Sequence, residues 1–248
     1  MPSPAFDDTM KPADDDAQFE ELTRIDGLAG PSPQKLADAL RVGSCPEDRA
    51  FDRFLPEDLR IISGEYWTPL AVAARGAEWL EALGARSVLD IGSGAGKFCV
   101  ASALAGRCDV SGLEHRPRLV AAARALARLF SVEERVHFIE GALGDTPLPK
   151  VDAYYLYNPF AENLFGVGEL TEPVELSSTR YARDIALVED LLQRAPMGNI
   201  VLVYNGYGGR IPSSYREVRS DRHLPNVLRM WRKTRTGYGD GLSLAEKN

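Results

Sequence analysis

The chain has 248 residues, of which 44% are apolar and 26% are charged, and this length can bury one full globular core. The composition excludes a disulfide-rich miniprotein, a collagen-like fibre and a wholly disordered chain. The formal net charge of −7 is concentrated near the N-terminus. Residues 1–22 hold seven acidic residues and one lysine, so residues 23–248 carry 28 basic and 29 acidic side chains. The acidity therefore says little about the substrate.

The cysteines and the N-terminus indicate the cellular compartment. Cys45, Cys99 and Cys108 form no C-x-x-C pair, which favours a reducing environment and argues against a structural zinc site. The N-terminus lacks the basic start and apolar run of a signal peptide, and no apolar stretch approaches the roughly 18 residues of a membrane-spanning helix. We expect a cytoplasmic protein with no membrane partner.

The N-terminal quarter of the chain has no sheet pattern. Prolines and aspartate runs in residues 1–16 predict a disordered acidic leader, because such a segment buries too little apolar surface to offset its ordering entropy. Residues 17–62 are predicted to form a helical cap. Its helices are expected around 17–25, 33–42 and 48–60.

Short apolar runs then alternate with longer segments of helical period, which is typical of successive βα units on a parallel sheet. The predicted helices are 68–83, 96–105, 117–130 and 178–194; the predicted strands are 87–91, 109–114, 135–139, 153–157, 200–204 and 227–232. We expect an α/β core over residues 63–236 and a flexible tail over residues 237–248.

The most specific segment runs from Val88 to Lys97 and reads V-L-D-I-G-S-G-A-G-K. Glycines at alternating positions let the backbone turn sharply and lie against a ligand. A phosphate-binding P-loop is excluded, because Ile91 replaces its first glycine and Phe98 replaces its hydroxyl residue. A dinucleotide-binding loop is disfavoured, because Lys97 stands where its third glycine packs helix against strand.

This segment resembles motif I of the class I S-adenosylmethionine (SAM) methyltransferases, D-x-G-x-G-x-G. Asp90, Gly92, Gly94 and Gly96 are in register with that motif. The resemblance implies a Rossmann-like seven-stranded sheet with SAM as cofactor. It also fits Asp90 to the ammonium group of SAM. Glu114, at the end of the next strand, is placed to accept the ribose hydroxyls.

Three further residues complete the predicted cofactor site near these motifs. Ser93 belongs to the glycine loop, and His115 follows Glu114 where it could line an adenine pocket or bridge to solvent. The family usually places an aspartate for adenine after the third strand, whereas this chain has Ala142. Glu140, Asp145 or a backbone contact could serve instead.

The predicted fourth strand ends in Tyr157-Asn158-Pro159-Phe160, which resembles the N-P-P-[YF] motif of amino N-methyltransferases with one proline removed. In-line transfer needs a neutral nitrogen with its lone pair aimed at the methyl carbon. The carbonyl groups of Asn158 and Pro159 can accept N–H bonds that set this direction. The aromatic faces of Tyr157 and Phe160 can stabilise the developing positive charge. The alternative is that Asn-Pro only ends a strand.

A narrower resemblance covers roughly residues 62–165. The segments Gly64-Glu65-Tyr66, Gly112-Leu-Glu114-His-Arg-Pro117 and Asn158-Pro-Phe-Ala161 are similar to the core of the disruptor-of-telomeric-silencing lysine methyltransferases. It implies that Glu65 and Thr68 lie over the amino-acid end of SAM. Pro159 departs from the Asn-Asn of that family, and there is no strongly basic tail. The resemblance therefore favours a nitrogen acceptor rather than histones.

Three further groups of residues bear on function: potential metal ligands, a basic segment and a set of aromatic residues. No cluster of His, Asp and Glu has metal-ligand spacing, so no metal is expected. Residues 210–235 hold eight basic side chains, which could bind a phosphate or an acidic substrate, although a solvated surface is the commoner explanation. The aromatic residues Tyr66, Trp67, Tyr157 and Tyr207 could wall an acceptor pocket.

The sequence predicts a SAM-dependent methyltransferase whose acceptor is an amino nitrogen on a protein side chain, such as lysine, or on another molecule. A nucleic acid is not the expected partner. The alternatives are a small-molecule O-methyltransferase and a non-catalytic binding module that keeps the SAM fold. A nicotinamide-dependent oxidoreductase is a more distant possibility.

Overall fold

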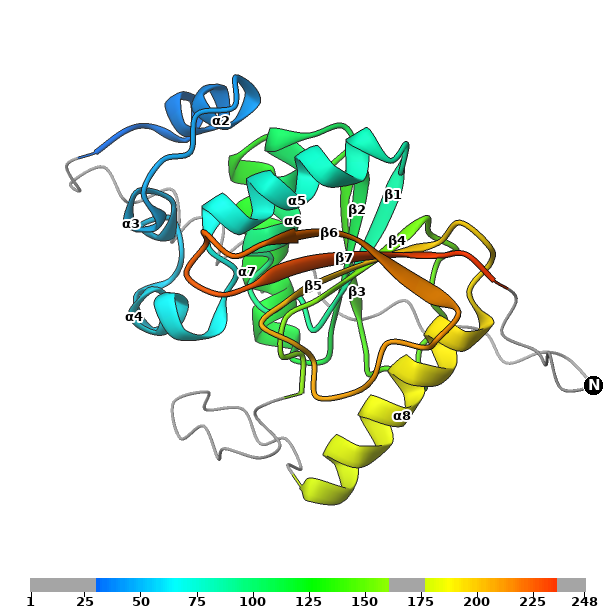
Figure 1. The fold of residues 1–248 in the computed structure, drawn as a ribbon. Coiled ribbons are helices and arrows are strands. Elements are labelled where there is room, and N and C mark those ends of the chain that lie inside the picture. Colours follow the sequence, from blue (N-terminus) through cyan, green and yellow to red (C-terminus); the bar gives the residue numbers. More distant parts are fainter. Residues whose placement is uncertain (1–29, 161–176, 236–248) are drawn as a thin grey trace, which may run out of the picture.

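The computed structural model describes residues 30–160 and 177–235, and Figure 1 shows their arrangement. The predicted leader, the helix expected around 17–25 and the tail over 237–248 lie outside the described residues. In the parts that are described, no helix is both long and apolar enough to cross a membrane.

The N-terminal cap contains three short helices, α2 (Pro33–Arg41), α3 (Asp48–Asp52) and α4 (Glu57–Tyr66). Ser32 caps α2, since its side-chain oxygen accepts a hydrogen bond from the Lys35 amide. The single helix predicted over 48–60 is two helices in the structure. Pro56 separates them, because proline disfavours helical geometry in the residue before it.

A seven-stranded sheet follows the cap, with the order β3-β2-β1-β4-β5-β7-β6. The strands are β1 (Ser87–Ile91), β2 (Asp109–Glu114), β3 (Val136–Glu140), β4 (Ala153–Leu156), β5 (Ile200–Tyr204), β6 (Tyr215–Asp221) and β7 (Leu228–Lys233). The helices of this part are α5 (Leu70–Ala82), α6 (Lys97–Ala105), α7 (Pro117–Leu129) and α8 (Ser178–Arg194). Strands β1 to β5 are parallel, and β7 runs antiparallel to both β5 and β6. The predicted Rossmann-like α/β fold is confirmed.

Strand β6 was not among the predicted elements. Its sequence, Y-R-E-V-R-S-D, is mostly polar, and four of its seven side chains are exposed. An edge strand with one neighbour needs no buried apolar alternation, and charged side chains protect its free edge from pairing with other chains. Its pairing with β7 therefore had no counterpart in the hydrophobic pattern.

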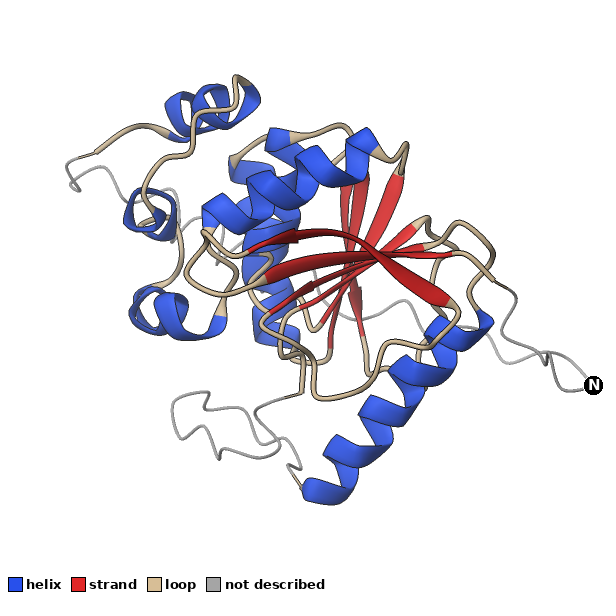
Figure 2. Ribbon diagram, in the orientation of Figure 1, coloured by secondary structure: helices blue, strands red, loops and turns tan. Residues whose placement is uncertain are grey.

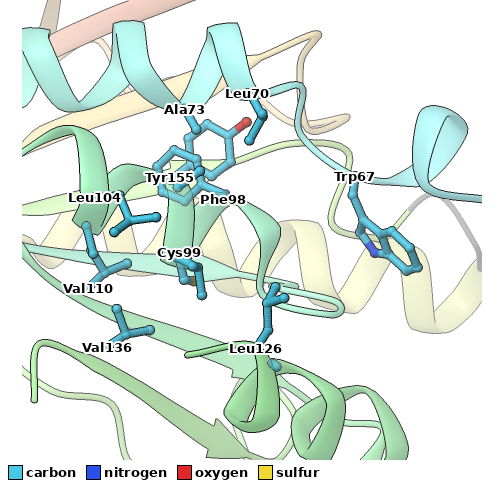
Figure 3. Packing of buried hydrophobic residues seen from close by; sticks show 14 of the residues in the cluster. Trp67, Leu70, Ala73, Phe98, Cys99, Leu104, Val110, Leu126, Val136 and Tyr155 are labelled. Carbon is cyan, nitrogen blue, oxygen red and sulfur yellow. The ribbon is translucent and has the colours of Figure 1, made fainter. Parts of the chain in front are cut away.

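The helices cover the two faces of the sheet unequally (Figure 2). The cap, α5, α6 and α7 share one apolar core on the first face, whereas α8 packs on the second face. On the first face the rings of Phe98 and Tyr155 stack with their centroids 3.6 Å apart (Figure 3). Phe51 of α3 stacks on Phe130 at 4.8 Å, so the cap belongs to the same core as the sheet.

Lys97 ties the cap to the beginning of α6. Its side chain is 1% exposed, and its Nζ lies 2.7 Å from a carboxylate oxygen of Asp48 and 2.7 Å from one of Asp52. It also donates a hydrogen bond to the Ser63 hydroxyl. The same Asp48 oxygen accepts the backbone N–H of Leu70 at the start of α5. The lysine that disfavoured a dinucleotide loop is thus a structural anchor.

Candidate functional site

A cavity of about 320 Å³ opens at the carboxyl ends of the parallel strands. This is the edge of an open α/β sheet where ligands usually bind, and the volume lies in the range of small-molecule sites. Its walls come from the loops after β1, β2, β3 and β4, the end of α4 and the start of α8. Its lining includes ten predicted site residues: Glu65, Gly92, Gly94, Glu114, His115, Ala142, Tyr157, Asn158, Pro159 and Phe160.

Four predicted cofactor residues do not line this cavity. Thr68 is buried, and its hydroxyl lies 2.8 Å from the Tyr155 hydroxyl in the core. Ser93 is also buried, and its backbone N–H bonds the Leu113 carbonyl of β2. Gly96 is the N-cap of α6, and Asp90 lies in β1 among buried side chains. Direct cofactor contact by these four residues stays a prediction.

The glycine loop owes its shape to three left-handed residues. Gly92, Gly94 and Gly96 have φ angles of +78°, +54° and +78°, which side chains rarely tolerate. A Cβ atom on Gly92 would lie 2.9 Å from that of Pro159, and one on Gly94 would collide with the Trp67 indole. The glycines therefore permit both the turn and the close approach of the β4 loop and the cap.

Glu114 presents a carboxylate to the cavity at the end of β2. The residue is 6% exposed, and its two oxygens accept the backbone N–H groups of Gly94, at 3.0 Å, and Arg116, at 2.9 Å. A carboxylate oxygen has two lone-pair sites, so each can accept a further hydrogen bond from a ligand hydroxyl. This geometry fits the predicted role of Glu114 toward a ribose.

Asp90 lies in a less polar environment. Burial raises the pKa of its carboxyl from 3.8 to about 8, while a hydrogen bond from the Cys99 thiol opposes the shift, and the charge of Glu114 adds to it. The carboxyl is mainly protonated at neutral pH in the ligand-free protein. A neutral carboxyl has no charge to attract an ammonium group, so charge pairing with SAM would require its ionisation.

The β4 motif forms the wall opposite Glu114. Asn158 is exposed and has a left-handed φ of 40°, a conformation that asparagine tolerates better than most residues. Its backbone N–H bonds the Gly206 carbonyl after β5, at 3.1 Å. The Tyr157 hydroxyl donates to the Glu65 carbonyl at the end of α4, at 3.4 Å. The motif is thus held by β5 on one side and by the cap on the other.

The start of α8 contributes two lining residues that the sequence analysis missed, Arg180 and Asp184. They are one helical turn apart, with Nε of Arg180 3.7 Å from a carboxylate oxygen of Asp184. A charged pair on a helix surface carries no motif, so only their placement against the cavity reveals them. His115 lies on the same side, and burial together with Arg116 and Arg180 lowers its pKa to about 4. His115 is therefore neutral at neutral pH.

Aromatic residues from the cap and from the β4 motif line the cavity. They are Tyr66 and Trp67 at the end of α4 and Tyr157 after β4, as the sequence suggested, while Tyr207 lies outside the cavity. Among residues 30–160 and 177–235, no group of three or more His, Cys, Asp or Glu side chains could hold a metal ion.

Comparisons with known proteins agree on the fold. Residues 49–154 match the family model described as protein-L-isoaspartate(D-aspartate) O-methyltransferase. An RNA methyltransferase from Salinibacter ruber, solved with S-adenosyl-L-homocysteine, is 20% identical with a TM-score of 0.50, and the match covers 67% of this chain and 92% of that one. A putative O-methyltransferase from Klebsiella pneumoniae is 12% identical with a TM-score of 0.48, over 88% and 97% of the two chains. No curated protein matches.

The strand order, the family match and the structural likeness together give the chain the class I methyltransferase fold, for which SAM is the cofactor. The family model is named for O-methyl transfer and the Salinibacter ruber structure is an RNA methyltransferase, so these matches do not fix the type of acceptor. The narrower resemblance to lysine methyltransferases is not supported by these matches.

Proposed function

We propose that the protein transfers the methyl group of SAM to an amino nitrogen. The observation that supports this most directly is the position of Asn158. It stands in a left-handed conformation at the end of β4, in the same cavity as Glu114 and the glycine loop. A cofactor held by the loop and Glu114 would therefore face the Asn158 side chain.

The cavity residues fit SAM by their chemistry. The Glu114 carboxylate is a hydrogen-bond acceptor suited to the two ribose hydroxyls, and Gly92 and Gly94 present backbone without side chains. Ala142 and His115 line the region next to Glu114, and we assign them to the adenine. Glu65, from the cap, also lines the cavity, and we assign it to the amino-acid end of SAM. When bound, SAM supplies an electrophilic methyl group on a sulfonium.

The β4 motif has the groups that a neutral amine requires. The side-chain oxygen of Asn158 and the backbone carbonyl of Pro159 can accept the N–H bonds of the amine, which leaves its lone pair free for attack. Tyr157 and Phe160 also line the cavity, so their ring faces can stabilise a cation that forms there. The proton that the nitrogen must lose can pass to solvent, because Asn158 is exposed.

Transfer to oxygen is the second candidate. It is favoured by the match of residues 49–154 to a family named for O-methyl transfer. That reaction needs a base or an ionised oxygen at the acceptor position. Of the lining residues, Glu65 and Asp184 could act as bases. Mass spectrometry of the methylated product separates attachment to nitrogen from attachment to oxygen.

Asn158→Gly tests the proposal, because glycine removes the amide and keeps the left-handed backbone. We expect SAM affinity, measured by calorimetry, to stay within about twofold. We expect methyl transfer from radiolabelled SAM to amines to fall by a factor on the order of 100, the usual cost of losing one positioned polar group. Unchanged turnover would show that the Asn158 side chain has no role in methyl transfer.

Ser131→Gly is the matched control, since Ser131 also has a left-handed φ, of 54°, and lies on the surface between α7 and β3, away from the cavity. It should leave both measurements unchanged. A wild-type chain that binds SAM and methylates neither amines nor hydroxyl compounds would favour the non-catalytic binding module. A chain that does not bind SAM at millimolar concentration would exclude all three readings.

A further inference from the structure

We propose that a second cavity, at the carboxyl end of β5, binds an oxyanion of the methyl acceptor, so that the acceptor is a small amine that also carries a phosphate or carboxylate group. The second half of this inference rests on the proposed function. The cavity measures about 500 Å³ and lies between the loop after β5 and the hairpin of β6 and β7.

Its lining combines positive charge with an apolar surface. Arg222 and Arg229 line the cavity, and among the described residues no aspartate or glutamate lines it. Val203 and Trp231 supply apolar surface beside them. Arg229 lies opposite Val203 and Trp231 opposite Val201, so both side chains lie on the α8 face of the sheet. Guanidinium groups bind phosphate and carboxylate with paired hydrogen bonds, and the apolar surface suits the organic part of the same molecule.

The two arginines are not engaged elsewhere in the described structure. Neither makes an ion pair or side-chain hydrogen bond within residues 30–160 and 177–235. The neighbouring acid Asp221 is already paired with Arg75, at 3.3 Å, and accepts the His223 amide. Glu217 lies opposite Trp231 in register but does not line the cavity. Within the part of the chain that the structure describes, no acidic side chain is paired with either arginine of the cavity.

Other basic residues of the same segment have structural partners. Lys233 is buried and donates to the carbonyls of Leu192, Gln193 and Ala195 at the end of α8. Arg219 lies over the Trp79 ring, 5.9 Å from its centroid. The basic residues of this segment therefore differ in their surroundings, because Lys233 and Arg219 have structural partners, whereas Arg222 and Arg229 line the cavity.

The wall of the cavity is built rather than loose. The Tyr207 hydroxyl donates to the Arg210 carbonyl at 2.5 Å, and the Arg210 amide donates to Glu189 of α8 at 2.8 Å. Gly208 and Gly209 lie so close to α8 that a Cβ on either would collide with a neighbouring side chain. The loop is therefore held against α8 by these contacts.

The second cavity adjoins the proposed methyl-transfer site. The Gly206 carbonyl, in its wall, accepts the Asn158 amide at 3.1 Å. An acceptor whose amine lies at Asn158 can therefore extend toward the arginines.

Calorimetric titration of the full chain, with S-adenosylhomocysteine present to fill the first cavity, tests anion binding. The probes are phenyl phosphate, benzoate and the neutral analogue benzamide. We expect the better of the two oxyanions to bind at least about tenfold more tightly than benzamide, and which one does so separates phosphate from carboxylate. Arg222→Ala and Arg229→Ala should each weaken it by about tenfold.

Arg216→Ala and Arg232→Ala are matched controls, since both arginines lie on the same hairpin, are exposed, and do not line the cavity. They should change oxyanion affinity by less than about twofold. Equal binding of benzamide, or equal losses in all four variants, would overturn the anion site. If a single-stranded RNA binds and all four substitutions lower its affinity equally, the arginines belong to a nucleic-acid surface instead.

Methyl transfer to paired amines, one with a carboxylate or phosphate and the other with a carboxamide, tests the link to the acceptor. Wild type should prefer the anionic member, and Arg229→Ala should remove the preference. Anion binding without such a preference would refute the acceptor role of the cavity. If no amine of either kind is methylated while the oxyanion still binds, the proposed function fails and the anion site stands.

Discussion

At the scale of single residues, the acidic groups of the predicted cofactor site differ in environment although the sequence presents them alike. Asp90 and Glu114 both stand near the ends of neighbouring parallel strands. Glu114 reaches the cavity and accepts two backbone N–H groups, whereas Asp90 lies behind the glycine loop against Cys99. Burial favours the neutral form of Asp90, whereas Glu114 meets polar backbone groups at the cavity.

The Asp90 environment predicts a pH-dependent stability. The unfolded chain ionises Asp90 near its ordinary pKa of 3.8, whereas the native chain retains the proton until about pH 8. Its contribution to the free energy of unfolding is therefore complete below pH 3.8 and is lost progressively as the pH rises to about 8. Asp90→Asn removes this loss. The free energy of unfolding of the variant, relative to that of wild type, should therefore be greater at pH 8 than at pH 5.

Urea denaturation of the ligand-free protein at pH 5 and pH 8 measures this difference. Asp109→Asn is the control, since Asp109 is an exposed acid at the start of β2. The control should change stability equally at the two pH values. A constant difference between Asp90→Asn and wild type from pH 5 to pH 8 would show that native Asp90 titrates like an exposed group.

At the scale of elements, the cap and the glycine loop are joined through one buried lysine. Lys97 begins α6 directly after the loop, and its amine lies between Asp48 and Asp52 of α3. Helix α4 then carries the chain from α3 to Trp67, which packs on Gly94. The cap therefore contributes to the cofactor cavity, and Lys97, which directly follows the loop, positions it.

Lys97→Met should lower the free energy of unfolding by about 3 kcal/mol, because the buried carboxylate of Asp52 loses the cation that it pairs with. The measurement is urea denaturation, with hydrogen exchange to locate the loss in α3 and α4. The double variant Lys97→Met/Asp52→Asn should regain part of the loss. Lys150→Met, at an exposed position between β3 and β4, is the control. If Lys97→Met lowers the free energy of unfolding no more than the control does, Lys97 does not join the cap to the glycine loop.

At the scale of the whole molecule, the net charge of −7 and the proposed chemistry belong to different parts of the chain. Seven acids lie within residues 1–22, whereas the residues that line the two described cavities fall between Glu65 and Trp231. The proposed anion site also has the opposite sign to the chain as a whole. Local charge, rather than net charge, is what an acceptor in this cavity would meet.

Removal of residues 1–16 should therefore leave SAM affinity unchanged within about twofold, as measured by calorimetry. It should also leave the affinity for phenyl phosphate or benzoate unchanged at moderate salt, because charges farther away than the Debye length of about 10 Å are largely screened. A tighter anion affinity after truncation would indicate that the leader competes for the arginines.

The sequence by itself determined the α/β fold class, five of the seven strands in correct order, the glycine loop and ten of the cavity-lining residues. These features follow from local rules: apolar periodicity, helix starts and stops, and the glycine pattern that a tight turn requires. The last strand was also found and, like β3, was predicted one residue before its observed bounds. Strand β6 was missed because an edge strand has no buried alternation.

Only the tertiary structure decided which of the motif residues face the cavity. Thr68, Asp90, Ser93 and Gly96 have the expected positions in the sequence, yet they do not line the cavity. Arg180 and Asp184 have no motif, and they reach the cavity because α8 packs across the sheet. Direction and neighbourhood depend on long-range packing, and sequence spacing fixes only the local backbone. The two arginines of the second cavity were visible as charge but became a candidate site only through the folding of the hairpin against the loop after β5.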